Sequence, residues 1–160
     1  MFDKFGEFDS WEEINKAAAG QKAEGDEEAL KELANENGID MDDVEDYFDG
    51  AIKELCTPLT AAFGKLFVEN EELKTRDIMN DWYNYIVTLV AGDERMAIAV
   101  RKKGKSLKGC IGELLKWSFK HQRNIDKDIM KEAGVTASKC TIGIPGMAQA
   151  HKIIKDYYGG

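Results

Sequence analysis

The spacing of hydrophobic positions is helical along almost the whole chain. Apolar side chains recur every three or four residues, beginning with Trp11, Ile14, Ala17 and Ala18, and this period places them on one face of a helix. Glycines and capping residues divide the pattern into short segments. No long run alternates between apolar and polar residues as a half-buried strand does, and only residues 135–144 could include a short strand.

Helix starts are marked by side chains that can accept a hydrogen bond from a free backbone N–H. Ser10 and Glu13 have the spacing of a capping box, and Thr57 precedes Pro58, which suits the first position of a helix. Further caps are predicted at Asp26, Asp40, Asp93, Ser106 and Asn124. The predicted helices cover residues 11–24, 27–35, 41–49, 58–73, 94–103, 107–120 and 125–133. Another begins at Thr75 or Arg76 and ends at Gly92, and the last follows Pro145 or Gly146 and ends near Tyr158.

This pattern predicts an all-α fold, a compact bundle of roughly seven to nine short helices. The helix over 58–73 is expected to bury four apolar side chains, namely Leu59, Phe63, Leu66 and Phe67. The most apolar helix, over 107–120, is expected to bury Leu107, Cys110, Ile111, Leu114, Leu115 and Phe119.

Charge changes sign along the chain. Residues 1–50 carry 17 acidic and 4 basic side chains, a net charge of −13, whereas residues 101–160 carry 5 acidic and 13 basic ones, a net charge of +8. A gradient of this size indicates an electrostatic partner, or pairing between the two ends of the chain, or two solvated faces that differ in charge. We expect an acidic helical arm or subdomain over 1–55 and a helical core with a basic C-terminal half over 56–160.

The composition excludes several classes of protein. The chain has 160 residues, of which 43% are hydrophobic and 32% charged, so it can bury a core. No apolar run approaches the roughly 20 residues that a membrane-spanning helix needs. Its first residues are acidic and lack the layout of a signal peptide. Three widely spaced cysteines, Cys56, Cys110 and Cys140, are more consistent with thiols in a reducing compartment than with disulfides. We therefore expect a soluble cytoplasmic protein that does not bind membranes.

Residues able to perform catalysis are scarce. The two histidines, His121 and His151, do not form a zinc pattern with the cysteines. The acidic run over 40–51 has Glu45 and Ala51 where an EF-hand loop needs glycine and glutamate. Glycine patterns typical of nucleotide-binding loops are also missing. We predict no catalytic residue, no metal and no cofactor, and hence a binding protein rather than an enzyme.

Two basic groups could bind phosphate. The first lies where one predicted helix ends and the next begins, and it comprises Arg101, Lys102, Lys103, Lys105 and Lys108. The second extends along the chain with Trp117 and His121 as stacking groups, and it comprises Lys116, Lys120, Arg123 and Lys127. Either group could instead be a solvated basic face with Trp117 half buried.

Residues 128–141 resemble the helix-turn-helix of bacterial repressors. In this interpretation Gly134 takes the turn, Thr136 caps a recognition helix and Lys139 contacts DNA. Gly143 and Pro145 limit that second helix to about two turns. The segment suggests a DNA-binding regulator.

A longer resemblance covers about the last 60 residues. Lys105-Ser106-Leu107-Lys108-Gly109-Cys110-Ile111 opens a helix, and Ile154-Lys155-Asp156-Tyr157-Tyr158 closes the final one. Together they resemble the C-terminal half of the PcfK-like proteins of Firmicute plasmids, conjugative elements and phages, a group that includes inhibitors of Cas9. The resemblance implies a small mobile-element protein that binds a nucleoprotein effector.

Three hypotheses follow. The first is a non-enzymatic phage or mobile-element protein that inhibits or modulates a bacterial nucleic-acid effector, with CRISPR–Cas9 as the named candidate and with charge mimicry of DNA as the mechanism. The acidic residues expected to contact that partner are Asp42, Asp43, Glu45, Asp46 and Asp49. For this first hypothesis, Trp11 or Trp117 could instead anchor the interface. The second is a helix-turn-helix-like regulator that binds nucleic acid through its C-terminal third. The third is a phage or plasmid accessory protein with protein contacts only.

Overall fold

The computed structural model describes residues 2–159, and most of that span is helical. The elements in chain order are α1 (Trp11–Ala23), α2 (Glu27–Glu36), α3 (Met41–Asp49), α4 (Pro58–Leu73), α5 (Ile78–Gly92), α6 (Glu94–Arg101), α7 (Leu107–Lys120), β1 (Arg123–Asn124), α8 (Lys127–Glu132), β2 (Thr141–Ile142) and α9 (Met147–Gly159). The predicted all-α class is confirmed, since the described residues hold nine helices and one two-stranded sheet. None of these helices is both long and apolar enough to cross a membrane.

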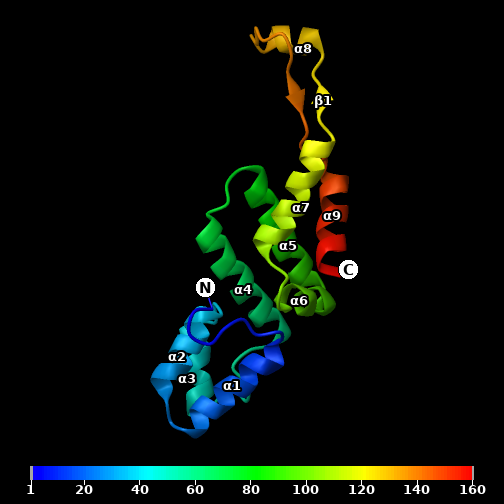
Figure 1. Ribbon diagram of the computed structural model, residues 1–160. Coiled ribbons are helices and arrows are strands. Elements are labelled where there is room, and N and C mark those ends of the chain that lie inside the picture. The colour runs from blue at the N-terminus through cyan, green and yellow to red at the C-terminus, as the bar shows by residue number, and fades with distance from the viewer. Residues whose placement is uncertain (1, 160) are drawn as a thin grey trace.

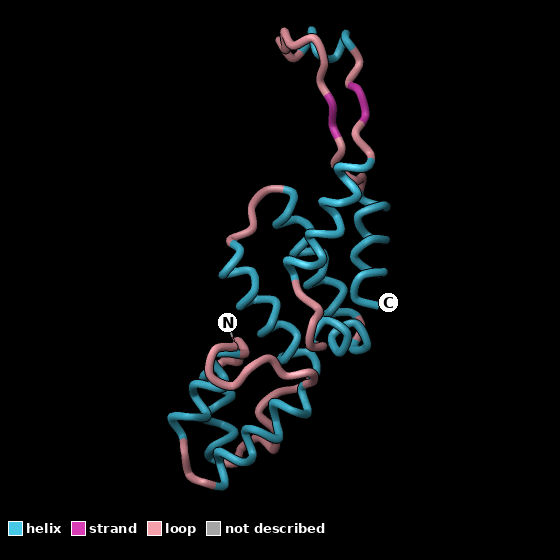
Figure 2. The backbone as a smooth tube through the Cα atoms, viewed as in Figure 1, coloured by secondary structure: helices cyan, strands magenta, loops and turns pink. Residues whose placement is uncertain are grey.

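The elements are arranged along one long axis (Figure 1). Helices α1, α2 and α3 form one end, and α4–α7 with α9 form the middle. Residues 121–146, which contain β1, α8 and β2, project from the other end and are called the arm below. Figure 2 shows that the arm leaves the end of α7 and returns to the start of α9 as two nearly parallel chain segments.

The predicted caps explain most helix starts. Ser10 accepts a hydrogen bond from the Glu13 N–H, and Thr57 forms a reciprocal capping box with Thr60 at the start of α4. The predicted caps Asp26, Asp40, Asp93 and Ser106 also accept a backbone N–H each. These starts were predictable because a cap needs only residues adjacent in sequence.

The buried side chains form two hydrophobic clusters. One unites α1, α2 and α3 with Leu55 and Cys56, and the other unites α4, α5, α6, α7 and α9. They meet inside α4, where Ala61 belongs to the first cluster and Ala62 to the second. The boundary predicted after residue 55 lies a few residues before this meeting point.

The N-terminal end and the middle of the molecule touch through a pair of glycines. Gly38, between α2 and α3, has a positive φ of 66° and lies against Gly64 of α4. A Cβ on Gly64 would overlap the Asn37 carbonyl oxygen, and a Cβ on Gly38 would overlap the Gly64 backbone. Only glycines allow α4 to approach the α2–α3 connection this closely.

Several side chains predicted to be buried are exposed. Leu59 and Phe67 are 37% and 56% exposed, because α4 directs Ala61, Lys65 and other residues inward instead. Leu115 and Phe119, near the end of α7 where the arm begins, are 47% and 75% exposed. Helical spacing identifies a stripe of apolar residues, but it does not say how much of the stripe a neighbour covers.

The arm differs from the helix predicted over 125–133. Arg123 and Asn124 form a strand that pairs antiparallel with Thr141 and Ile142, so Asn124 is not a cap. Asp126 caps the short helix α8 instead, by accepting the Asp128 N–H. The strand β2 lies inside the region 135–144, where the sequence permitted a short strand.

Replacing Gly64 with alanine tests the glycine contact. We expect Gly64→Ala to lower the free energy of unfolding by roughly 1–3 kcal/mol, because the added methyl group forces backbone apart at a packed junction. Gly20→Ala in α1 is the matched control, since nothing lies within 4 Å of a Cβ there. That variant should gain about 0.5–1 kcal/mol from helix propensity. Urea denaturation measures both, and equal effects would contradict this account of the junction.

Candidate functional site

The acidic candidate residues lie on α3. Val44 and Tyr47 of this helix are buried in the N-terminal cluster, and the helical period turns the remaining positions outward. Of the five predicted residues, four are exposed, namely Asp42, Glu45, Asp46 and Asp49. These four side chains are called the α3 acidic face below.

The fifth residue, Asp43, is half-buried. Burial raises the pKa of its carboxyl, and the neighbouring carboxylates Asp40, Asp46 and Asp42 raise it further. Asp43 is therefore less available to a partner than the other four.

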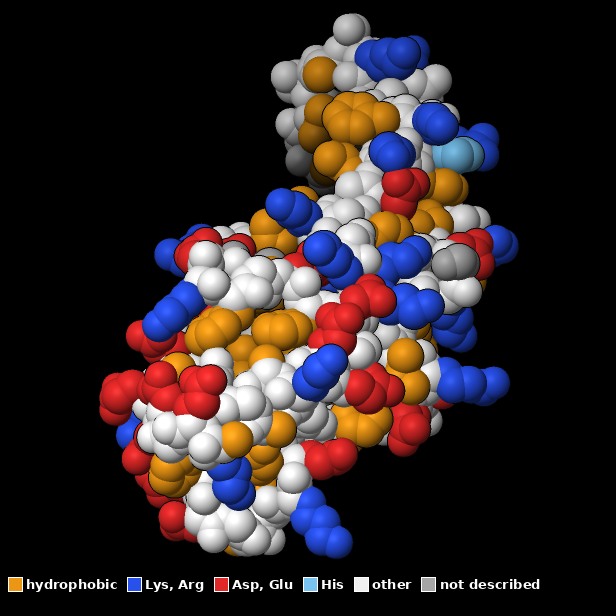
Figure 3. All heavy atoms as spheres, turned by 60° about the horizontal axis from the view of Figure 1, so that its bottom comes forward, with side chains coloured by type: hydrophobic (Ala, Val, Ile, Leu, Met, Phe, Trp, Pro, Cys, Tyr) orange, Lys and Arg blue, Asp and Glu red, His pale blue; other side chains and the backbone are white. Residues whose placement is uncertain are grey.

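Figure 3 shows acidic side chains gathered at the lower left of the view, whereas lysine and arginine side chains are most frequent in its upper half.

Arg101 is not a surface cation, which corrects the prediction for this residue. Its side chain is 1% exposed, and Nη2 donates to Oδ1 of Asn37 over 2.8 Å. The Phe2 ring lies 5.5 Å from the guanidinium carbon. Burial lowers the pKa of Arg101. The residue joins α6 to the end of α2 and cannot contact phosphate.

The other residues of the first basic group differ in availability. Lys102, Lys103 and Lys108 are exposed. Lys105 is half-buried, with Nζ donating to the Tyr157 carbonyl oxygen over 2.6 Å and lying 5.0 Å from that residue's ring. The five predicted cations thus reduce to three exposed ones.

The second basic group is exposed throughout. Lys116 and Lys120 lie one turn apart on α7, and Arg123 follows at the base of the arm. Beside them the Trp117 and His121 rings stack at 4.2 Å between centroids, and His121 Nδ1 lies 2.8 Å from the Trp117 carbonyl oxygen. The candidate stacking groups already stack on each other.

The helix-turn-helix prediction for residues 128–141 is wrong. Helix α8 ends at Glu132 and Gly134 makes a turn with φ of 70°, as the pattern requires. No helix follows, because residues 135–140 are an exposed loop that leads into β2. Thr136 caps nothing, and Lys139 is an exposed loop residue, so there is no recognition helix to enter a groove.

Two of the three cysteine thiols, Cys56 and Cys110, are buried. Burial raises the pKa of the Cys56 and Cys110 thiols to about 12, which makes them poor nucleophiles. The same residues contain no group of three histidine, cysteine or carboxylate side chains that could hold a metal ion.

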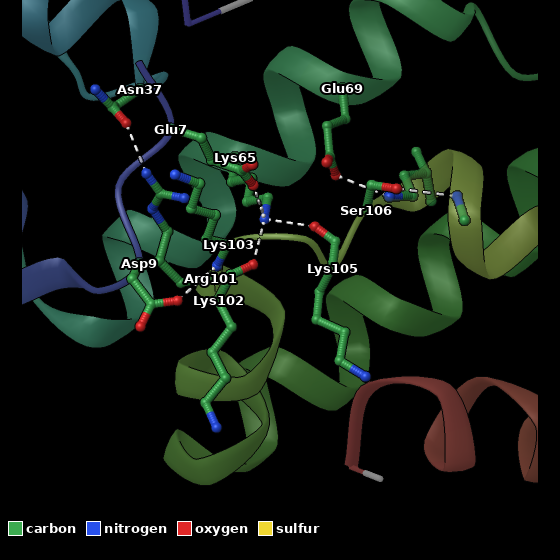
Figure 4. A network of polar contacts seen from close by, with 12 residues as sticks. Glu7, Asp9, Asn37, Lys65, Glu69, Arg101, Lys102, Lys103, Lys105 and Ser106 are labelled. Atoms are coloured by element: carbon green, nitrogen blue, oxygen red, sulfur yellow. Dashed lines mark hydrogen bonds and ion pairs between the residues drawn. The ribbon is translucent and has the colours of Figure 1, made fainter. Parts of the chain in front are cut away.

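A buried polar network lies between the two hydrophobic clusters (Figure 4). Lys65, 1% exposed on α4, donates from Nζ to Glu7 Oε1 at 3.0 Å and to the carbonyl oxygens of Lys102 and Lys105 at 2.9 and 2.6 Å. Burial lowers the pKa of Lys65, although Glu69 and Glu7 oppose this effect. One ammonium thereby connects the N-terminal segment, α4 and the α6–α7 connection.

Glu69, one turn after Lys65 on α4, is a second buried carboxylate beside this network. It is 4% exposed, and Oε2 accepts the Leu107 N–H at 3.1 Å at the start of α7. Its Oε1 has no hydrogen-bond partner among the described residues. Burial raises the pKa of Glu69 to about 7, while Lys65 and the Leu107 N–H act in the opposite direction.

Sequence reasoning missed Lys65, Glu69 and Asn37. A signal was present, because Lys65 and Glu69 occupy the same helical stripe as Ala62 and Leu66, which are both buried. A lysine and a glutamate at i and i+4 inside an apolar stripe indicate a buried pair rather than a surface one. No comparable sequence signal marks Asn37.

Comparison of the chain with protein-family models, with curated proteins and with solved structures found no match.

The pH dependence of stability tests the position of Glu69. Folding raises the pKa of Glu69 from 4.5 to about 7, so the folded protein binds this proton more tightly than the unfolded chain does. The resulting contribution to the free energy of unfolding is complete below about pH 4.5 and is lost as the pH rises to about 7. The variant Glu69→Gln cannot lose this proton and should not show this loss. Its free energy of unfolding, relative to that of the wild type, should therefore increase by on the order of 2–3 kcal/mol between about pH 5 and pH 8. Urea denaturation across this range measures the difference, with exposed Glu71→Gln as control. A constant difference would show that Glu69 titrates normally.

Proposed function

We propose that this protein acts without catalysis, by binding a cationic nucleic-acid-binding surface of a partner protein through its acidic end. The observation that carries the proposal is the α3 acidic face, whose four carboxylates are exposed on a helix held by Val44 and Tyr47. Residues 1–50 have a net charge of −13 around it. A polyanionic surface on a helix resembles a phosphate backbone in charge. It can therefore bind a cationic groove that normally holds nucleic acid.

Electrostatics favours competition with nucleic acid. Lysines and arginines that bind phosphates gain free energy when condensed counterions are released, and an acidic protein surface can occupy the same side chains. The fixed positions of the carboxylates limit the entropy lost on binding. Such a protein would be expected to bind fast and to lose affinity as salt increases.

The partner we propose first is a Cas9-type effector of a bacterial host. The support is the resemblance of Lys105–Ile111 and Ile154–Tyr158 to the PcfK-like proteins, a group that includes Cas9 inhibitors. Cas9 holds nucleic acid in a positively charged channel, which an acidic protein end could enter. Under this proposal the protein belongs to a phage or mobile element and acts in the bacterial cytoplasm.

Reversing the charge of the α3 acidic face tests the proposal. The variant Asp42→Lys, Glu45→Lys, Asp46→Lys, Asp49→Lys should inhibit DNA cleavage by guide-loaded Cas9 at least about tenfold less than the wild type, because each lysine repels the cationic channel. Asp43 is left unchanged because it is half-buried.

A matched control places the same charge change elsewhere. Asp81, Glu94, Glu132 and Asp156 are exposed acidic residues outside the acidic end, and their replacement by lysine should leave inhibition nearly unchanged. Equal inhibition by both variants and the wild type would rule out charge mimicry by α3. Absence of inhibition by the wild type would rule out Cas9 as the partner.

A second function, direct binding of duplex DNA, is favoured by the exposed row Lys116, Lys120 and Arg123 beside the Trp117–His121 stack. Binding through these side chains would involve phosphates rather than base edges, since residues 135–140 form no recognition helix.

Fluorescence anisotropy with a labelled duplex tests this second function. If the row binds phosphates, affinity should fall steeply between about 50 and 200 mM salt, and replacing its three cations by alanine should reduce the salt slope by about 2–3. The triple variant Lys152→Ala, Lys155→Ala, Lys131→Ala removes exposed lysines elsewhere and serves as control. No binding at low salt would eliminate this function.

A further inference from the structure

A groove lies between the α2–α3 connection and the C-terminal half of α4. Its volume is about 640 Å³. One wall is formed by residues at the end of α2 and the start of α3, including Ile39, Asp40 and Met41, and the other by Phe67, Val68 and Glu71 of α4.

The groove results from the glycine contact described above. Gly38 and Gly64 hold the two walls in contact at one point. Phe67 lies three residues after Gly64 on a similar face of α4, but α4 continues beyond the α2–α3 connection and leaves this ring 56% exposed. Met41, on the opposite wall, is 39% exposed. Two large apolar side chains are therefore open to solvent in one concave site.

The charged residues that line the groove are all acidic. They are Asp40 on one wall and Glu71 and Glu72 on the other, and none of the lysines or arginines within residues 2–159 lines the groove. Asp40 is also the N-cap of α3, so the groove is continuous with the helix that carries the α3 acidic face. An occupant that suits both features has an apolar side with cationic residues along its edges.

We propose that this groove binds a basic amphipathic helix of the partner protein. In that complex the apolar side of the helix packs on Phe67 and Met41, and its lysines or arginines pair with Asp40 and Glu71, as in other helix-in-groove complexes. The proposal rests on the proposed function and extends it. The α3 acidic face supplies attraction at a distance, and the groove supplies an anchor that selects among cationic proteins.

The apolar contact can be separated from general attraction between opposite charges. One labelled synthetic peptide contains leucines at helical spacings of three and four among lysines and alanines. The second has the same composition with the leucines scrambled, so that no apolar face forms. The wild type should bind the first peptide at least about tenfold more tightly than the second, as measured by fluorescence anisotropy.

Substitutions on the two walls locate the binding site. Phe67→Ser and, separately, Met41→Ser should remove most of the preference for the first peptide, because each removes an exposed apolar contact without opening the core. Phe119→Ser is the matched control, since that ring is 75% exposed far from the groove at the end of α7. Circular dichroism confirms that each variant is folded.

Each outcome discriminates between the two proposals. Equal affinity for both peptides, or an effect of Phe119→Ser as large as that of Phe67→Ser, would overturn the groove as a docking site. In the Cas9 assay, one outcome is that Phe67→Ser inhibits as strongly as the wild type while reversal of the α3 acidic face abolishes inhibition. That result would overturn the groove as a docking site and support the proposed function. If the peptide preference depends on Phe67 but the reversal has no effect on inhibition, the proposed function fails and the groove remains a binding site for cationic helices.

Discussion

The buried ammonium of Lys65 is the interaction on which the rest of this structure depends. An ammonium ion out of water costs several kcal/mol unless oxygen atoms surround it, and here three oxygens come from Glu7 and from the carbonyls of Lys102 and Lys105. Those oxygens belong to the N-terminal segment and to the α6–α7 connection, so both must be in place before Lys65 can be buried. Because Lys65 lies just after the point where the two hydrophobic clusters meet in α4, this requirement holds the acidic end rigidly against the helical middle.

The network also uses charged groups inside the molecule. Lys65 pairs with Glu7, Arg101 donates to the Asn37 side chain, and the backbone N–H of Lys103 donates to Asp9. These contacts join the N-terminal end of the molecule to α4 and to the α6–α7 connection. The carboxylates of the α3 acidic face take no part in this pairing and remain at the surface. The distinction separates charges that hold the fold from charges that are available for binding.

Local sequence predicted the helices well and the arm poorly. Caps at Ser10, Thr57 and Ser106 needed only neighbouring residues, so their positions could be predicted. Residues 128–141 have a sequence pattern typical of a helix-turn-helix. A short helix, however, is stable only when another part of the protein packs on its apolar side. The arm projects away from the rest of the molecule (Figure 1), and residues 135–140 form a loop beside α8 instead of a second helix. The exposure of four acidic residues on α3 was predictable because Val44 and Tyr47 define the inner side of that helix.

The amino-acid sequence by itself determined the all-α class, most helix boundaries and the excess of acid in the first third of the chain, since these depend on periodicity, capping and composition. Only the tertiary structure decided which charges are buried and which apolar residues are exposed. Arg101 and Lys65 are enclosed because separate segments supply oxygen atoms to them, and Phe67 is open because the glycine contact places α4 at the edge of a groove. Both outcomes depend on contacts between residues far apart in the chain, which no local pattern specifies.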